Sequence, residues 1–265
     1  MKEILEKLAR GEISVEEAAD ALRVLAVEEV GELAKYDLGR EIRHGVPEVV
    51  IAEGKTPKAV TAIITKVMER KGSVIVSRAD KKHVEALQKQ IAGNRWRTDR
   101  TESGTLAIMS EAKKAGLTGG KVGIVTAGTS DIPVAEEARL MAMEMGCEVY
   151  TAYDVGVAGI HRLIPPLKEM VTVDVDAIVV VAGREGALPT LMAGMIDVPL
   201  IAVPTSYGYG LGGKGVAALM AMLQSCSLGL AVVNIDGGIP AGAMAALIAN
   251  RAARFRDSKR GNKRK

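Results

Sequence analysis

Uninterrupted apolar runs alternate with helical patterns over the second half of the chain. Residues 177–181 and 200–203 contain no polar position, which is typical of strands buried on both faces of a parallel sheet. The pattern predicts further strands at 121–126, 148–153 and 230–235, and helices at 133–145, 161–170, 188–195, 216–225 and 241–255. Strands that alternate with helices form right-handed βαβ units. The predicted fold class is therefore α/β, with a doubly wound parallel sheet.

The first half of the chain has a different pattern. Residues 1–30 predict two short helices, and Ser14 with Glu17 forms a capping box that begins the second of them. Residues 36–114 are more charged, with one strand-like run at 73–76 between helical patterns at 57–69 and 80–91. We interpret this part as a smaller N-terminal α+β domain, joined to the rest by a glycine-rich hinge at 116–120. The predicted division is 1–117, 118–257 and a basic tail at 258–265.

Composition favours a soluble protein that acts in the cytoplasm. The chain has 265 residues, of which 48% are hydrophobic and 3% aromatic, so its core must consist of aliphatic residues and methionine. It has no signal-peptide pattern and no apolar stretch of about 18 residues. Two distant cysteines argue against a disulfide framework or a zinc site. The net charge of +3 lies largely in residues 251–265, where no aromatic residues alternate with the basic ones, so we expect neither a nucleic-acid nor a membrane partner.

Candidate site residues follow the first strand of the second half. Ligands of open α/β sheets bind outside the carboxyl ends of the strands. Gly128, Thr129, Ser130 and Asp131 stand there, and either Ser130 or Asp131 could cap the next helix, with Pro133 in its first turn. The same helix N-terminus suits a phosphate or a carboxylate. It lacks the G-x-G-x-x-G spacing, which disfavours a Rossmann dehydrogenase.

Later strand ends carry further candidates. Arg184 and Glu185 stand between two glycines, Gly183 and Gly186, and form either a binding site or an ordinary βα turn. The loop 206–215 is rich in glycine, and its amides could surround a phosphate although its spacing is not that of a P-loop. Its candidates, together with the aspartate that follows the last strand, are Ser206, Gly208, Gly210, Lys214 and Asp236. We expect Asp236 to meet the residues after the other strands at one edge of the sheet.

A histidine and a cysteine complete the set. His161 begins a predicted helix, where it is either a proton carrier or a helix-initiating residue without a chemical role. Cys226 lies at the end of another predicted helix, where a free cysteine is usually a small buried hydrophobe. The helix dipole at that end also disfavours a thiolate. Position alone therefore favours a structural role for Cys226, and Cys147, just before a strand, has the weaker case for reactivity.

Several short blocks together resemble two related families. Residues 128–131, the helix after them, 182–189 and 193–195 resemble the carboxyaminoimidazole ribonucleotide mutases of the PurE fold. The closer resemblance is to the PurE-like LarB family, through residues 36–40, 45–48, 53–56, 155–162, 223–226 and 232–238. It spans nearly the whole chain and implies a PurE-like catalytic domain at 118–257. His161 and Arg162 stand in a different context from the histidine–arginine pair of the mutases, which makes a purine mutase the poorer assignment.

The LarB resemblance implies a carboxylase and hydrolase in the biosynthesis of the nickel-pincer cofactor of lactate racemase. Such an enzyme converts nicotinic acid adenine dinucleotide and carbon dioxide or bicarbonate into pyridinium-biscarboxylic acid mononucleotide and AMP. It would be a homo-oligomer, on family analogy an octamer. The alternatives are a PurE-type mutase or carboxylase for an aminoimidazole ribonucleotide, which needs no cysteine, and a nucleotide-binding regulator without catalysis.

The resemblance also implies roles for single residues. Cys226 would be the nucleophile that adds to the pyridinium ring, and Glu185 the base that removes the ring proton. Ser130, Asp131 and the amides of 208–215 would hold phosphate or ribose, with a magnesium ion on Asp131 or Asp236. Arg40 and Lys55, with Thr56, would add a site for an anionic ligand in the N-terminal domain, or else form a surface ion-pair cluster.

Overall fold

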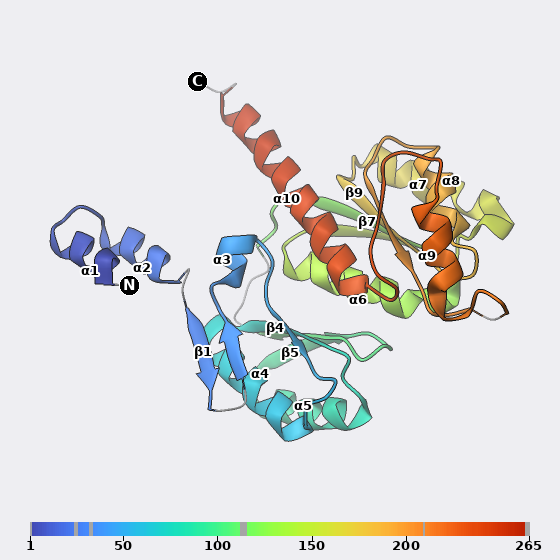
Figure 1. The fold of residues 1–265 in the computed structure, drawn as a ribbon. Coiled ribbons are helices and arrows are strands. Elements are labelled where there is room, and N and C mark those ends of the chain that lie inside the picture. Colours follow the sequence, from blue (N-terminus) through green and yellow to red (C-terminus); the bar gives the residue numbers. More distant parts are fainter. Residues whose placement is uncertain (1, 24–25, 32–33, 112–115, 209, 263–265) are drawn as a thin grey trace. The chain divides into compact units, whose positions relative to one another are not determined.

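The computed structural model describes the chain except for residues 1, 24–25, 32–33, 112–115, 209 and 263–265 (Figure 1). It consists of two compact units. The first comprises Met1–Arg100 and Gly104–Lys114, and the second comprises Thr101–Ser103 and Ala115–Lys265. Among the helices that are described, none has the length and apolar character needed to cross a lipid bilayer.

The first unit begins with the two helices expected from the sequence, α1 (Lys2–Ala9) and α2 (Val15–Arg23). The capping box is confirmed, because the Ser14 amide donates to Glu17 Oε2 at 2.7 Å and the Glu17 amide donates to Ser14 Oγ at 3.1 Å. An antiparallel hairpin of β1 (Val27–Val30) and β2 (Ala34–Asp37) follows. The sequence pattern had not predicted this hairpin.

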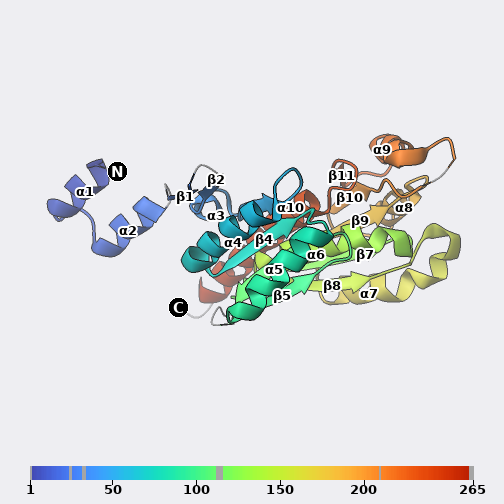
Figure 2. The same cartoon turned by 90° about the horizontal axis from the view of Figure 1, so that it is seen from below.

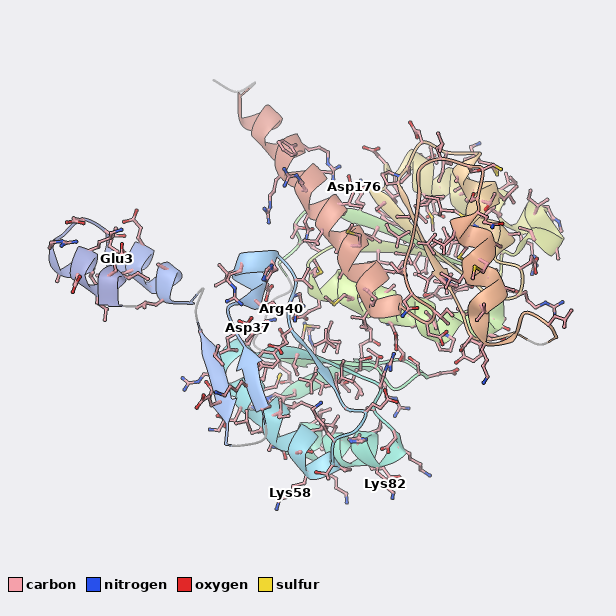
Figure 3. The ribbon with its side chains drawn as sticks, viewed as in Figure 1. Glu3, Asp37, Arg40, Lys58, Lys82 and Asp176 are labelled. Carbon is pink, nitrogen blue, oxygen red and sulfur yellow. The ribbon has the colours of Figure 1, made fainter. Side chains whose placement is uncertain are left out.

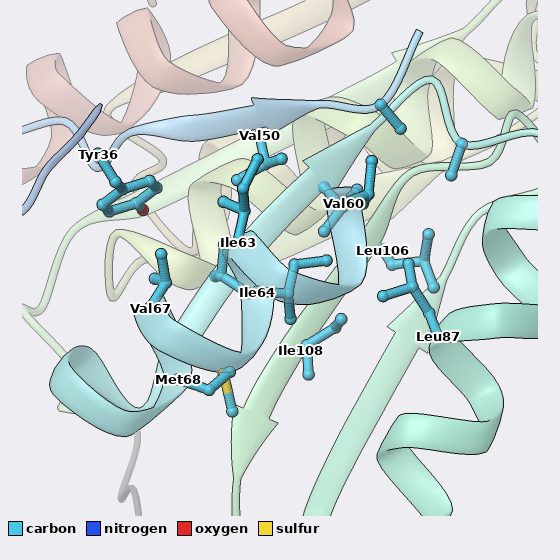
Figure 4. Packing of buried hydrophobic residues seen from close by; sticks show 14 of the residues in the cluster. Tyr36, Val50, Val60, Ile63, Ile64, Val67, Met68, Leu87, Leu106 and Ile108 are labelled. Atoms are coloured by element: carbon cyan, nitrogen blue, oxygen red, sulfur yellow. The ribbon is translucent and has the colours of Figure 1, made fainter. Parts of the chain in front are cut away.

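A four-stranded sheet forms the centre of the first unit. Its strand order is β3-β4-β6-β5, with β3 and β4 parallel and the other pairs antiparallel. Helix α4 packs its buried residues Ile63, Ile64 and Val67 into a core shared with Leu106 and Ile108 of β6 (Figure 4). The bounds are α3 (Arg40–His44), β3 (Val49–Ile51), α4 (Pro57–Lys71), β4 (Ser73–Ser77), α5 (Lys81–Gly93), β5 (Trp96–Arg100) and β6 (Leu106–Ser110).

The second unit contains a five-stranded parallel sheet, which confirms the predicted fold class. Its order is β11-β10-β9-β7-β8, and this can be followed in Figure 2. Every pair is parallel, because each strand returns to the sheet through a helical crossover. The strands are β7 (Lys121–Thr126), β8 (Glu148–Ala152), β9 (Ala177–Ala182), β10 (Leu200–Pro204) and β11 (Leu230–Val232).

Helices cover both faces of this sheet. Leu167, Leu188 and Met222 come from three successive helices and share one core with alternate residues of the strands. The intervening residues Val179 and Val181 are equally buried on the other face, where α6 and α10 contact β7 and β9. The helices are α6 (Ile132–Glu144), α7 (Ile164–Thr172), α8 (Ala187–Ala193), α9 (Val216–Leu223) and α10 (Gly238–Asn262).

The largest differences from the expected helix bounds are at the start of α7 and the end of α10. Helix α7 begins at Ile164, with proline in its first turn, and not at His161, which lies in the 3-10 segment η2 (Val157–Arg162). Proline lacks an N–H and fixes φ, so it favours the start of a helix. Helix α10 continues well past 255, and residues 263–265 of the predicted basic tail lie outside the described residues.

A partly buried ion pair holds α10 at the amino end of the sheet. Asp176, labelled in Figure 3, is 5% exposed at its side chain and pairs with the Arg256 guanidinium. Its Oδ2 also accepts a hydrogen bond from the Lys121 amide at 2.8 Å, and Arg256 Nη2 donates to the Gly119 carbonyl at 2.9 Å. This cluster lies at the edge of the sheet opposite to the candidate site.

Candidate functional site

A pocket of about 540 Å³ lies at the carboxyl edge of the parallel sheet, where the strand order reverses around β7. This is where ligands bind in doubly wound folds. The loops that follow β7, β8, β9 and β10 line it, and we refer to it as the main pocket. The predicted site residues that line it are Gly128, Ser130, Asp131, Arg184, Glu185 and Gly208.

Asp131 is the most constrained acid of the main pocket. It is only 4% exposed, and it ends the short 3-10 segment η1 (Thr129–Asp131). Its Oδ1 accepts a hydrogen bond from Thr205 Oγ1 at 2.7 Å, and its Oδ2 accepts one from the Gly128 amide at 2.9 Å. Asp131 stands at the N-cap position of α6, with proline in the first turn as expected, but its side chain makes no capping hydrogen bond to that helix and instead accepts the bonds from Thr205 and Gly128.

Burial raises the pKa of the Asp131 carboxyl above its ordinary value, and the negative charge of Asp236 acts in the same direction. Hydrogen bonds from Thr205, Gly128 and Gly183 stabilise the charged form and oppose the shift without cancelling it. A carboxyl with a raised pKa exchanges a proton closer to neutral pH than an ordinary aspartate does. Asp131 therefore has the electrostatics of an acid–base group.

The loop after β9 lies against the loop after β10. A Cβ atom on Gly183 would lie 2.7 Å from Thr205 Oγ1 and closer still to the Tyr207 carbonyl oxygen, so only glycine fits there. The next residue, Arg184, has a left-handed φ of 52°, which is uncommon for a residue with a side chain. Such strain is often found at functional sites. The close contact holds Arg184 and Glu185 at the main pocket.

Arg162 also lines the main pocket, although sequence reasoning had not selected it. Its Nη1 donates to Asp154 Oδ2 at 2.9 Å, and the Asp154 amide donates to Thr126 Oγ1 at 3.0 Å. The neighbouring His161 is exposed and outside the lining. Arg162 stands in the block 155–162 that carries the family resemblance, and this was the available signal.

Two more residues that the sequence reasoning missed are Thr205 and Tyr207, the latter in the lining itself. Thr205 is 1% exposed and is the first polar residue after the apolar strand β10, which was its only signal. The residue between these two in the sequence, Ser206, donates a hydrogen bond from its amide to Asp236 Oδ1 at 2.8 Å. Of the remaining predicted residues, Thr129, Gly210 and Lys214 are exposed and do not line the main pocket.

The acidic side chains that the structure describes do not form a complete metal site. Among the residues that the structure describes, no group of three or more His, Cys, Asp or Glu side chains is arranged to hold a metal ion. Each oxygen of Asp131 accepts a protein hydrogen bond, whereas only one oxygen of Asp236 does so in the described part of the chain. Asp236 is therefore the carboxylate better able to share a magnesium ion whose other ligands are phosphate oxygens and water.

A second pocket of about 520 Å³ adjoins the main pocket. Val157, Glu185 and Ala187 belong to the lining of both. The other residues of the second pocket are Ile160, Gly186, Thr190, Leu191 and Ala221. Glu185 therefore stands at the junction of the two pockets, of which the second has the more strongly apolar lining.

Cys226 is exposed and lies in the loop between α9 and β11. The serines on either side of it both bind Thr190. Thr190 Oγ1 donates to Ser225 Oγ at 3.0 Å, and Ser227 Oγ donates to the Thr190 carbonyl at 2.9 Å. These bonds tie the two serines that flank Cys226 to Thr190, which lines the second pocket, whereas neither Cys226 nor the two serines belong to that lining. Cys147, by contrast, is buried, and burial raises the pKa of its thiol to about 11, which leaves it unreactive near neutral pH.

Arg40 and Lys55 lie in the first unit. Arg40 begins α3 and is exposed (Figure 3), and Lys55 Nζ donates to the Ile51 carbonyl at 2.8 Å. Nearby, Asp37 pairs with Arg43, and the Tyr36 hydroxyl donates to the Glu48 carbonyl at 2.8 Å. These contacts account for the conspicuous residues of 36–48 as parts of the fold of this unit. A role of Arg40 or Lys55 in ligand binding stays a prediction.

Comparison with known protein families shows to which family the chain belongs. Residues 27–103 match the LarB/PurE-like N-terminal domain, and residues 121–263 match the AIR carboxylase family. The chain belongs to the LarB family. A protein of Methanocaldococcus jannaschii, whose name assigns no activity, is 44% identical over 258 residues, which cover 94% of this chain and 96% of the relative. The resemblance inferred from the sequence blocks is thereby confirmed, and the α/β unit that contains both pockets is a carboxylase-type domain.

Proposed function

We propose that this LarB-family protein converts nicotinic acid adenine dinucleotide and carbon dioxide into pyridinium-biscarboxylic acid mononucleotide and AMP. The observation that supports this best is the adjoining pair of pockets, with Glu185 at their junction and the Cys226 loop bound to the wall of the second. Both halves of the reaction need such an extended site, because a ring is carboxylated at one place and an anhydride is cleaved at another.

The main pocket suits the phosphoanhydride. Arg162 and Arg184 supply guanidinium groups, which bind phosphate oxygens through paired hydrogen bonds. Ser130 adds a hydroxyl at the same wall. Asp131 stands among these groups, and its raised pKa suits it to take a proton from the water that attacks phosphorus. A bound magnesium ion would neutralise phosphate charge, and Asp236 would hold it.

Carboxylation requires a nucleophile because a pyridinium ring is too electron-poor to attack carbon dioxide. In the proposed reaction, the Cys226 thiolate forms a bond to the ring carbon opposite nitrogen and produces a dihydropyridine. The neighbouring enamine carbon, on the side away from the existing carboxylate, then attacks carbon dioxide. Glu185 removes the proton from that carbon, and the electron pair restores the aromatic ring as the thiolate leaves. This covalent route divides one difficult step into easier ones.

The wider setting follows from the family. We propose that the product serves the biosynthesis of the nickel-pincer cofactor of lactate racemase, in the cytoplasm, and that the enzyme is a homo-oligomer. A PurE-type carboxylase or mutase for an aminoimidazole ribonucleotide is the second candidate, because residues 121–263 match the AIR carboxylase family. That reaction needs no thiol, so the two candidates differ in their dependence on Cys226.

The test is incubation of the full chain with nicotinic acid adenine dinucleotide, magnesium and bicarbonate, followed by mass spectrometry of small molecules and of intact protein. We expect AMP, a mononucleotide with one added carboxylate and a transient protein adduct, all lost in Cys226→Ala. Cys147→Ala is the matched control for a cysteine outside the site. Normal turnover by Cys226→Ala would exclude the covalent route, and conversion of an aminoimidazole ribonucleotide in its place would establish the second candidate.

A further inference from the structure

We infer that the first unit carries a separate binding site for an anion with two or three linked phosphate groups, in a groove between α4 and α5. The groove has a volume of about 490 Å³, and we refer to it as the lysine groove. Every residue of its lining belongs to one of these two helices. The site lies in a different unit from the main pocket, so it does not depend on the reaction proposed above.

The lining of the lysine groove has an excess of positive charge. It contains Lys58 of α4 and Lys82 and Lys89 of α5, against a single carboxylate, Glu85. All three lysines are exposed, and Lys58 and Lys82 are labelled in Figure 3. Among the described residues, none of the three ammonium groups has an ion-pair or hydrogen-bond partner. Glu85 therefore offsets only part of their mutual repulsion, which an anion bound between them relieves.

The starts of the two helices add to this positive potential. Lys58 stands in the first turn of α4 and Lys82 in the first turn of α5, and neither turn contains an acidic residue. The positive end of the helix dipole favours acidic side chains in the first turn and disfavours lysine. Both lysines thus oppose the intrinsic preference of their helices, which is expected where they serve an anion and not the stability of the helix.

Side-chain contacts hold the two walls of the lysine groove together at both of its ends. At the start of the helices, the His83 side chain is buried, with Nδ1 2.7 Å from Asp80 Oδ1 and Nε2 2.8 Å from the Lys55 carbonyl oxygen. Further along, Gln90 Nε2 donates to Thr65 Oγ1 at 3.1 Å. These contacts join α5 to α4 and to the residues just before it. The groove is therefore formed before a ligand binds, and binding requires little rearrangement.

The spacing of the lysines selects an anion with more than one phosphate group. Lys82 and Lys89 are seven residues apart on α5, which corresponds to about 10 Å along the helix. A single phosphate is shorter than this span, whereas a chain of two or three phosphates reaches lysines of both helices. Lysine binds phosphate as a compact point charge. The side chains of Ala62 and Ala86 are small and half-buried, so they leave room for such a chain between the helices.

The test is limited acetylation of the lysines of the full-length protein, with and without inorganic tripolyphosphate, with each modified lysine measured by peptide mass spectrometry. We expect acetylation of Lys58, Lys82 and Lys89 to fall by about fivefold or more at a saturating concentration. Lys66 of α4 and Lys168 of α7 are exposed and outside the lining, so they are the internal controls and should stay unchanged. Because each lysine is measured separately, tripolyphosphate that binds in the main pocket does not affect the result.

Variants at the exposed residues of the groove test the role of charge without disturbing the core. The concentration of tripolyphosphate that half-protects Lys89 measures the affinity. Lys58→Gln and Lys82→Gln should together weaken binding by about tenfold or more, whereas Glu85→Gln, which removes the only carboxylate of the lining, should strengthen it by about threefold. Lys66→Gln removes the same charge from α4 outside the groove and is the control, with an expected change of less than about twofold.

Other outcomes would overturn the proposal. Equal protection of all exposed lysines would show only a general attraction of anions to a basic surface, and protection of none would show no site. Protection by inorganic phosphate at the same concentration as tripolyphosphate would contradict the selection of linked phosphates. Protection by a polyglutamate peptide and not by tripolyphosphate would make the groove a surface for an acidic protein segment.

A comparison with ATP then distinguishes the two sources of linked phosphates. Protection of Lys58, Lys82 and Lys89 by ATP at a lower concentration than tripolyphosphate would support a nucleotide as the ligand, with further contacts from its base or ribose. Protection at the same or a higher concentration would support a site that recognises the phosphate chain alone. Both results agree with the proposal.

Discussion

The hydroxyl of Thr205 donates a 2.7 Å hydrogen bond to Oδ1 of Asp131, and neither residue is more than 4% exposed. The two residues come from different loops, after β10 and after β7, so the bond ties two walls of the site together. The other oxygen of Asp131 is held by the Gly128 amide. The carboxylate is therefore fixed in one orientation at the edge of the main pocket.

Thr205→Val should weaken this arrangement. Valine keeps the shape of threonine but removes the hydroxyl that donates to Oδ1 of Asp131, and the loss of a buried hydrogen bond to a charged group costs about 1.5–3 kcal/mol of folding free energy. We also expect kcat for AMP release to fall more than KM rises, because the carboxylate loses its orientation and not its contact with substrate. Thr205→Ser restores the donor and should recover most of kcat. A serine variant as impaired as the valine variant would show that the methyl group, and not the hydroxyl, matters.

Asp131 should also give a pH-dependent stability difference. Its pKa is raised in the folded protein, so the folded state binds more protons than the unfolded state between the ordinary value of 3.8 and the raised value. Its contribution to stability is full below the ordinary value and is lost as the pH rises through the raised pKa. Asparagine does not titrate, so the Tm of Asp131→Asn minus that of the parent should increase from about pH 4 to about pH 7. Asp197→Asn, at an exposed carboxylate, is the control, and a constant difference at residue 131 would contradict the raised pKa.

The parallel sheet was predictable because burial on both faces leaves an unmistakable pattern. The runs that form β9 and β10 contain no polar residue, and every position in them is buried. The strands of the first unit were harder to predict. Strand β5 has the sequence WRTDR and is largely exposed, and β3 has only three residues, so neither leaves an apolar run. These two strands form because they pair with neighbouring strands, and the local sequence pattern alone does not identify the pairing partners.

The sequence predicted which loops form the candidate site, but not which residues make hydrogen bonds between those loops. The rule that ligands bind at strand ends selected Asp131, Arg184 and Glu185, which do line the main pocket. It pointed only to the position of Thr205 after β10 and not to its role, which depends on a hydrogen bond to a residue 74 positions earlier in the chain. The hydrogen bonds from Thr190 to the serines beside Cys226 also join residues that are distant in the sequence. They could not be predicted, because serine and threonine have many ordinary roles near helix ends.

Glu185→Gln should distinguish a role in carboxylation from a role in substrate binding. The side chain is exposed at the junction of the two pockets, so glutamine keeps its size and its hydrogen bonding while it removes the base. We expect the rate of carboxylation to fall by about 10²-fold or more, as for the loss of a general base, with little change in dinucleotide affinity. Single-turnover mass spectrometry and calorimetry measure the two quantities. A loss confined to affinity would make Glu185 a binding residue and would require another base.

Thr190→Val should lower the reactivity of Cys226 toward the substrate ring, although it does not change Cys226 itself. The substitution removes the bond from Thr190 Oγ1 to Ser225 Oγ and leaves the Thr190 carbonyl bond from Ser227 in place. The Cys226 loop would then sample more positions, and a displacement of about 1 Å can cost about 10²-fold in rate. We expect slower formation of the protein–pyridine adduct, with the affinity for AMP unchanged. Ser225→Ala removes the same bond from the other side, together with the bond that Ser225 Oγ accepts from the Ser227 amide at 3.2 Å, so the double variant should be no slower than Ser225→Ala alone. Thr172→Val, at an exposed threonine of α7, is the control for the substitution itself. Adduct formation at the parent rate in both Thr190→Val and Ser225→Ala would mean that this bond does not position the thiol, and additive losses would mean that the two residues act separately.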